Sequence, residues 1–231
     1  MTFKPCTVAR GILVAAISLL LAGNSSAVLV IAGVSDGDLP VPGGSPRTIF
    51  IQTVTPIADL SLWGVGVANN GGGTDGQEFS FPSMSAEAGD VFVLSANASS
   101  QTFFQNNFSG HFIYFIDNDF VVSGDDAIEL FQEGAVFDVF GDPDTDGTGE
   151  DWEYKDGFAF RVPNTNPSSQ QGGFQSSDYL IQNGGFDGLD ETGHVALLAE
   201  VAEFTPINPI PEPAAGALAL LASLLLLRRR R

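Results

Sequence analysis

Residues 124–141 read GDDAIELFQEGAVFDVFG and combine turn-forming residues with runs of β-branched and aromatic ones. Residues 124–126 (Gly-Asp-Asp) suit a tight turn, because glycine and aspartate adopt backbone conformations that most other residues resist. The turn leads into a run that contains Ile128 and Leu130, and Ala135–Phe140 forms a second run shortly afterwards. This pattern predicts two β-strands.

Similar runs recur before this stretch, each bounded by glycine, proline, asparagine or aspartate. They are Thr48–Val54, Glu78–Phe81, Asp90–Leu94 and His111–Ile116. No amphipathic pattern long enough for a helix of about 12 residues interrupts them. The pattern predicts an all-β fold, an antiparallel β-sandwich over residues 28–205, with most of the 19 phenylalanines in its core.

The first 27 residues have the composition of an export leader. Lys4 and Arg10 precede an almost purely apolar segment, residues 11–23, which is shorter than the ~20 residues that a membrane span needs. Small residues follow, so we expect a signal helix within residues 1–27 and cleavage by signal peptidase after Ala27. A retained N-terminal anchor is the alternative. The single cysteine, Cys6, lies in this leader, so the mature chain would hold no thiol.

The C-terminal end also differs from the middle of the chain. Residues 206–213 (PINPIPEP) form a proline-rich linker, because proline supports neither a strand ladder nor a helix interior. The apolar segment Ala214–Leu227 would span ~21 Å as a helix, less than a hydrocarbon core of ~30 Å. It is followed by Arg228, Arg229, Arg230 and Arg231. We expect transient insertion into the inner membrane with the arginines on the cytoplasmic side, and a plain membrane anchor is the alternative.

Charge between the two ends is strongly one-sided. Residues 28–227 contain three basic and 28 acidic residues, a formal charge of −25. Such a surface repels nucleic-acid phosphates and anionic bilayers. We therefore expect no direct nucleic-acid binding, and soluble cations are better partners.

One acidic loop has the spacing of a calcium-binding loop. Its candidate ligands are Asp142, Asp144, Asp146, Thr148 (through its carbonyl), Glu150 and Glu153. Calcium takes about six to eight oxygen ligands, and a loop with a sharp glycine turn can bring several carboxylates to one point. Gly149 stands where an EF-hand has a β-branched residue, and no flanking helices are expected. A Ca²⁺ site of another kind is therefore one hypothesis, and an acidic surface turn is the other.

Signals for catalysis are sparse. His111 lies within an aromatic strand run and His194 follows a glycine, and neither belongs to a Ser/His/Asp or zinc motif. We expect both histidines to be structural or surface residues, and we expect no enzymatic activity.

The tail resembles the tripartite PEP-CTERM sorting signal of Gram-negative bacteria. Pro211, Glu212 and Pro213 stand at its motif, and the apolar segment and arginine-rich end follow in the same order over residues 214–231. The resemblance implies recognition and cleavage near the motif by an exosortase. It also implies delivery to the envelope surface or to an extracellular polymer matrix.

A second resemblance covers about residues 28–165, which are similar to a bacterial lamin-tail domain. The runs that carry it are Ile49–Gln52, Ala58–Val65, Phe79–Pro82, Ala88–Leu94 and Gly124–Gly141, in that order. The resemblance implies an immunoglobulin-like β-sandwich, with Trp63 pointing inward. A Gly/Ser/Asn-rich region, 164–188, and the apolar run Val195–Val201 extend beyond it. That run could either pair with the sandwich or lead to the linker.

These features predict an exported, surface- or matrix-associated protein that binds or supports rather than catalyses. Exopolysaccharide or other envelope components are the expected partners. Lamin-tail domains in bacteria often accompany secreted nucleases and phosphatases. The alternative is therefore an accessory binding module for a separately encoded secreted hydrolase.

Overall fold

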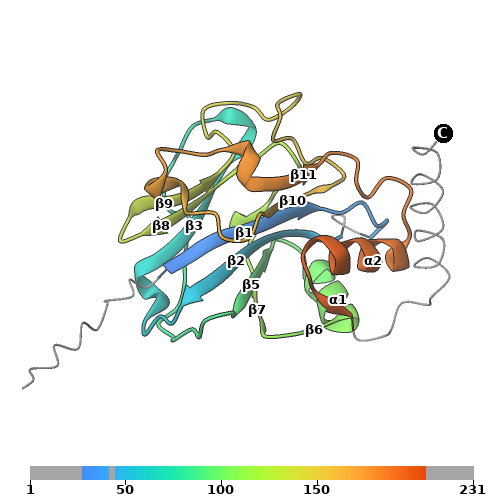
Figure 1. Cartoon of the computed structure of the whole chain (residues 1–231), viewed down its shortest axis with the longest axis horizontal. Coiled ribbons are helices and arrows are strands. Elements are labelled where there is room, and N and C mark those ends of the chain that lie inside the picture. The colour runs from blue at the N-terminus through green and yellow to red at the C-terminus, as the bar shows by residue number, and fades with distance from the viewer. Residues whose placement is uncertain (1–27, 42–44, 207–231) are drawn as a thin grey trace, which may run out of the picture.

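A computed structural model describes residues 28–41 and 45–206 and shows a β-rich, sandwich-like architecture. In Figure 1 the strands stack in layers, and both helices lie beside the larger sheet. The elements are β1 (Val28–Asp36), β2 (Arg47–Thr55), β3 (Trp63–Ala68), β4 (Phe79–Ser80), β5 (Val91–Ser95), α1 (Ala98–Asn107), β6 (Phe108–Ser109), β7 (Phe112–Ile116), β8 (Ala127–Gln132), β9 (Ala135–Phe140), β10 (Phe158–Arg161), β11 (Tyr179–Gln182), α2 (Glu191–Val201) and β12 (Thr205–Pro206). Most of these elements are strands in two sheets, so the predicted β-sandwich-like class is confirmed.

The strands form two principal sheets. One has six strands in the order β11-β10-β1-β2-β5-β7, and the other has four in the order β4-β3-β8-β9. A short pair, β12-β6, stands apart from both. The two strands predicted in residues 124–141 are present as β8 and β9, which pair antiparallel from Ile128 opposite Phe140 to Gln132 opposite Ala135.

The prediction of a wholly antiparallel sandwich is wrong at one place. Strands β5 and β7 pair parallel, with Val91 opposite Phe112 and Ser95 opposite Ile116. The helix α1 lies between them in the chain and returns the backbone to the end of the sheet where β5 began. A crossover of this kind makes the next strand run in the same direction.

The sandwich interior is filled by the facing sides of the two sheets. Trp63 at the start of β3 is 1% exposed, and its ring lies 5.1 Å from that of Phe137 in an edge-to-face arrangement, so the inward orientation expected for Trp63 is confirmed. The turn before β8 is also present. Gly124 has a φ of 87°, and a β-carbon there would lie 2.3 Å from the backbone of Lys155, so only glycine fits.

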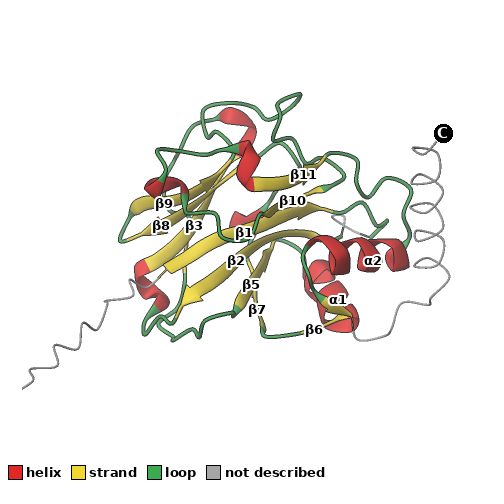
Figure 2. Cartoon of the chain, viewed as in Figure 1, coloured by secondary structure: helices red, strands yellow, loops and turns green. Residues whose placement is uncertain are grey.

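The outer face of the six-stranded sheet is covered by a third layer. Phe50 and Phe160 on the sheet pack with Phe104 of α1, Leu198 of α2 and Phe204. Figure 2 shows the two helices next to each other, and Asn107 Nδ2 donates to Glu191 Oε1 at 2.9 Å between them. The cluster therefore places residues 186–204 on the outer face of the six-stranded sheet, whereas Phe174 and Tyr179 pack into the sandwich interior.

The apolar run Val195–Val201 neither joins a sheet nor leads directly to the linker, because it forms most of α2. Asp190 caps this helix by accepting a hydrogen bond from Gly193 N at 2.9 Å. The two α-helices are 10 and 11 residues long. Both are shorter than the about 12 residues over which an amphipathic pattern was expected, so the lack of such a pattern did not exclude them.

Neither helix in the described ranges is long and apolar enough to cross a membrane. The expected signal helix (1–27), most of the proline-rich linker and the apolar sorting helix (214–231) lie outside the described residues.

Candidate functional site

The acidic loop after β9 folds into turns that use its carboxylates separately. Asp142 Oδ1 accepts from Asp144 N at 3.1 Å, and Asp142 Oδ2 accepts from the Thr145 hydroxyl at 2.9 Å. Asp146 Oδ1 accepts from Thr148 N at 2.9 Å, and this backbone N–H holds the pKa of Asp146 below its ordinary value. These are turn-stabilising contacts of the kind that aspartate makes in surface loops.

The other predicted calcium ligands also contact separate partners. The Thr148 hydroxyl donates to Asp125 Oδ2 at 3.1 Å. Glu153 Oε2 accepts from Gly149 N at 3.2 Å and from Asn183 Nδ2 at 2.7 Å, and Glu150 is exposed. Within residues 28–41 and 45–206, no group of three or more His, Cys, Asp or Glu side chains is placed to hold a metal ion. The structure therefore does not bring the predicted ligands to one point.

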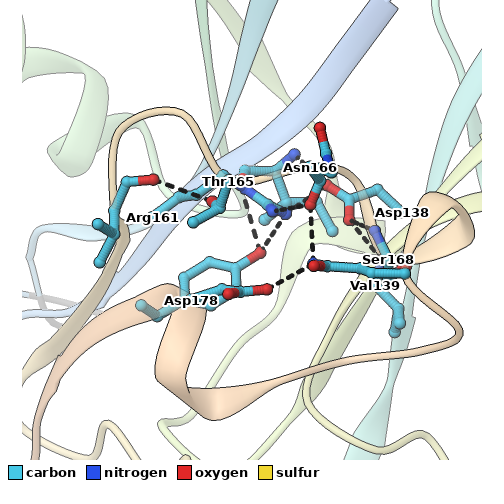
Figure 3. A network of polar contacts seen from close by, with 11 residues as sticks. Asp138, Val139, Arg161, Thr165, Asn166, Ser168 and Asp178 are labelled. Carbon is cyan, nitrogen blue, oxygen red and sulfur yellow. Dashed lines mark hydrogen bonds and ion pairs between the residues drawn. The ribbon is translucent and has the colours of Figure 1, made fainter.

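A buried ion pair links the two sheets (Figure 3). Asp138 on β9 is fully buried, and its Oδ2 lies 2.5 Å from Nη2 of Arg161 on β10. The same oxygen accepts from Ile31 N at 2.9 Å, while Oδ1 accepts from Ser168 N at 2.9 Å. Hydrogen bonds from backbone amides offset the cost of burying the carboxylate.

The guanidinium of Arg161 is satisfied from several directions. Its Nε donates to Ile31 O at 2.8 Å, and its Nη1 donates to Asn166 O at 3.0 Å. Nη2 also donates to the Tyr179 hydroxyl, and the guanidinium carbon lies 4.7 Å from the centre of that ring. Burial raises the pKa of Tyr179 above its ordinary value, although Arg161 favours the ionised form. The hydroxyl therefore stays protonated at neutral pH.

This network joins β1, β9, β10 and β11 to the loop after β10. The residues of this network were not among the site residues predicted from the sequence. One signal was available, because residues 28–227 contain only three basic residues and Arg161 follows the apolar run Phe158-Ala-Phe in a strand. A lone arginine on an apolar strand of an acidic protein predicts a buried partner.

Beside this network lies a hollow of about 510 Å³ on the outer face of the six-stranded sheet. Its floor includes Phe50 and Phe160, and its walls are the loop 162–165 and the segment from Glu200 to Phe204. Glu200 and Glu203 are exposed at its rim. An apolar floor with two carboxylates at the edge suits an apolar group that carries a hydrogen-bond donor or a positive charge.

The two histidines lie in unrelated environments. His194 is fully buried, with Nε2 3.1 Å from Asp38 Oδ1 and Nδ1 3.0 Å from Asp190 O, and its ring stacks on Phe186 at 4.5 Å. The side chain of His111 is 90% exposed, and its Nδ1 lies 3.8 Å from Asp90 Oδ1. His194 therefore fastens the start of α2 to the β1–β2 loop, and His111 stands on the surface.

Three buried carboxyl groups have raised pKa values, which is a property shared by many functional sites. Burial raises the pKa of Asp36 to about 6, although Arg47 Nε lies 2.8 Å away and opposes the rise. Burial also raises the pKa of Asp126 and of Glu129. Asp126 accepts from the backbone of Asn70 at 3.0 Å, and Asp36 accepts from that of Asp156 at 3.1 Å, so both carboxyls hold loops in place.

Comparison of this chain with protein-family models, with curated proteins and with solved structures finds no match. The predicted cleavage position Ala27 and the sorting residues Pro211–Pro213 and Arg228–Arg231 lie outside the described residues.

Proposed function

We propose that this chain is an exported, non-catalytic binding or structural protein of the bacterial cell surface or extracellular matrix. The observation that carries the proposal is the order of segments after the domain. Pro211, Glu212 and Pro213 follow within a few residues of β12, and an apolar segment and four arginines come next. This order is the one that PEP-CTERM sorting uses, so an exosortase is the expected processing partner.

The finer fold assignment is part of the same proposal. The two packed sheets, the β8–β9 hairpin and the inward Trp63 agree with a lamin-tail-like, immunoglobulin-like sandwich. The layer of α1, α2 and β12 would then be an addition to that sandwich.

A binding or supporting role also agrees with how the ionisable groups are used. Asp138 and Arg161 neutralise each other in the interior, and Asp36 and Asp126 hold backbone amides. The charge of −25 on residues 28–227 leaves an acidic exterior that attracts cations and hydroxyl-rich, uncharged polymers more readily than polyanions. Exopolysaccharide or another envelope component is the proposed partner.

The test follows the full-length chain in a bacterium that encodes an exosortase, using cell fractionation and mass spectrometry of both termini. The wild-type protein is expected at the surface or in the medium, lacking residues 1–27 and cleaved near Pro213. Replacing Pro211, Glu212 and Pro213 by alanine is expected to leave the tail attached and the protein in the membrane fraction. The matched control replaces Ile207, Asn208 and Ile210 by alanine, which alters the same linker outside the motif.

Full-length protein in the cytosol, with Met1 and Arg231 both present, would overturn the proposal. In the alternative, the chain is an accessory module for a hydrolase, and the hollow beside Arg161 is the site at which a partner group would bind. A surface-located protein that retains a secreted hydrolase and ignores exopolysaccharide would favour that alternative.

A further inference from the structure

Strand β7 forms one edge of the six-stranded sheet (Figure 1). Among residues 28–41 and 45–206 its only sheet neighbour is β5, and the flanking bonds run from Val91 N to His111 O at 3.1 Å and from Asp117 N to Ser95 O at 3.2 Å. Backbone groups in a parallel ladder alternate between the two sides of the strand. The N–H and C=O groups of Phe112, Tyr114 and Ile116 therefore face away from β5, toward the open edge.

The edge of the other sheet at β9 is protected, whereas no strand or 3₁₀ helix of the described part of the chain pairs with the outer edge of β7. Val139 N on β9 donates to Ser168 Oγ at 2.9 Å, and the short 3₁₀ helix Ser168–Gln170 packs beside it. By contrast, β7 reads FIYFI and contains none of the lysines, prolines or bulges that discourage edge pairing. Ile116 is 41% exposed. An apolar edge of this kind is suited to receive another strand.

The sequence around β7 is complementary to itself when two copies run antiparallel. With Tyr114 opposite the same residue of a second copy, Phe112 lies opposite Ile116, and His111 lies opposite Asp117. Phe112, Tyr114 and Ile116 of one copy then lie opposite Ile116, Tyr114 and Phe112 of the other. Each of these three pairs can exchange two backbone hydrogen bonds, because their N–H and C=O groups point toward the partner strand. The arrangement also places a basic side chain opposite an acidic one at both ends.

We propose that a second copy of this chain adds to the β7 edge in antiparallel orientation, about a twofold axis at Tyr114. The interface is isologous, so the same strand supplies both halves and no further edge remains there. A continuous sheet then runs through both molecules. Because each copy is strongly acidic, long-range repulsion opposes the approach, and the dimer is expected to strengthen as salt screens that repulsion.

The first experiment uses sedimentation velocity of the full-length chain in mild detergent, over about 1 to 100 µM protein and at about 0.05 and 0.3 M salt. His111 is altered because its side chain is 90% exposed and the change does not disturb the core. In the dimer, His111→Asp places an aspartate opposite Asp117 of the other copy at both ends of the paired strands. This repulsion is expected to raise the dissociation constant about tenfold. His111→Lys, the matched control at the same position, is expected to lower it.

The second experiment locates the axis. In a Cys6→Ser background, Tyr114→Cys is expected to give a disulfide-linked dimer on mild oxidation, because facing α-carbons in such a pair lie about 5.5 Å apart. Leu180→Cys is the control, since Leu180 is 51% exposed on β11 at the opposite edge of the sheet. It is expected to stay monomeric on a non-reducing gel.

The proposal fails if the chain sediments as a monomer at every concentration and salt level. It also fails if a dimer forms that ignores both His111 variants, or that cross-links through position 180 and not 114. A dimer that disappears when Ala214–Leu227 is removed but tolerates Tyr114→Lys would assign association to the tail instead. These outcomes do not depend on whether an exosortase processes the protein.

Discussion

Asp138 and Arg161 define the interior of this protein at the scale of single residues. The side chain of Asp138 is fully buried and that of Arg161 is 8% exposed, and each supplies the opposite charge that the other lacks. Removing one partner from such a pair leaves a buried charge without compensation, which costs much more than losing a surface ion pair. The pair therefore ties the chain at β9 to the chain at β10.

Arg161→Met is expected to lower the free energy of unfolding by about 3 to 5 kcal/mol, because Asp138 then remains buried without its cation. Urea denaturation monitored by tryptophan fluorescence measures the change. Lys155→Met, the same kind of substitution at an exposed position, is expected to cost less than about 0.5 kcal/mol. Equal losses in the two variants would contradict a stabilising role for the buried pair.

Asp36 gives a prediction about pH. Burial raises its folded-state pKa to about 6, from an ordinary value of 3.8. Between these two pH values the carboxyl is protonated in the folded protein but ionised in the unfolded chain. The favourable contribution of Asp36 to the free energy of unfolding is therefore present below about pH 4 and is lost as pH rises through 6. The shift corresponds to a loss on the order of 3 kcal/mol between these limits.

Asp36→Asn cannot ionise, so its free energy of unfolding is expected to fall less steeply between about pH 4.5 and 7.5 than that of the wild type. Denaturation at a series of pH values measures both slopes, and other carboxyls cancel in the difference. A variant at the exposed Asp59, Asp59→Asn, serves as the control and should keep the steeper slope. Parallel curves for wild type and Asp36→Asn would contradict the raised pKa.

At the scale of elements, the third layer depends on α2. Leu198 on this helix is fully buried against the phenylalanines of the sheet, while Leu189 just before the helix is 37% exposed. Besides this packing, α2 is held by its cap at Asp190, by the hydrogen bond from Asn107 to Glu191 and by the buried side chain of His194. Tertiary packing, more than helix propensity, is expected to keep it folded.

Leu198→Ala is therefore expected to cost about 2 to 5 kcal/mol, because it removes buried surface and leaves a cavity under α2. Leu189→Ala removes the same atoms at a half-exposed site and is expected to cost less than about 1 kcal/mol. Thermal unfolding followed by circular dichroism compares the two. If Leu189→Ala destabilised as much as Leu198→Ala, the described packing of α2 would be incorrect.

At the scale of the whole molecule, acidity dominates. Burial raises the pKa of Glu129, and the negative charges of Asp75, Asp144 and Glu78 raise it further. Three basic residues are too few to balance the acidic ones. Like charges on one compact domain repel each other, and this repulsion lowers the stability of the folded state. Salt is expected to relieve part of that cost.

Raising sodium chloride from about 0.02 to 0.5 M is expected to increase the unfolding temperature by several degrees, at a protein concentration where the chain is monomeric. Differential scanning calorimetry measures the effect. The double variant Asp75→Asn, Asp144→Asn should unfold at a higher temperature than the wild type in low salt and should gain less from added salt. A lower unfolding temperature in high salt would count against self-repulsion.

The sequence predicted the parts of the fold that rest on local pattern. Runs of β-branched and aromatic residues between turn formers located β8 and β9, and Gly124 and the two aspartates after it indicated the turn before β8. The helices were missed because α1 and α2 are short and their apolar faces are matched to one particular surface, the outer face of the β1–β2–β5 sheet. Local pattern does not contain that surface.

The calcium-like spacing after β9 shows the same difference between local sequence pattern and tertiary contacts at the candidate site. Spacing along the chain specified which carboxylates were available, but the turns assigned Asp142 and Asp146 to nearby amides and Glu153 to Asn183. Likewise, Asp138, Arg161 and Tyr179 are far apart in the chain and meet only because β9, β10 and β11 come together. Composition by itself determined the acidity of this protein, and the pattern of apolar runs between turn formers determined its β class. Tertiary structure decided which charges are buried together and which sheet edge stays open, because both depend on contacts between residues distant in sequence.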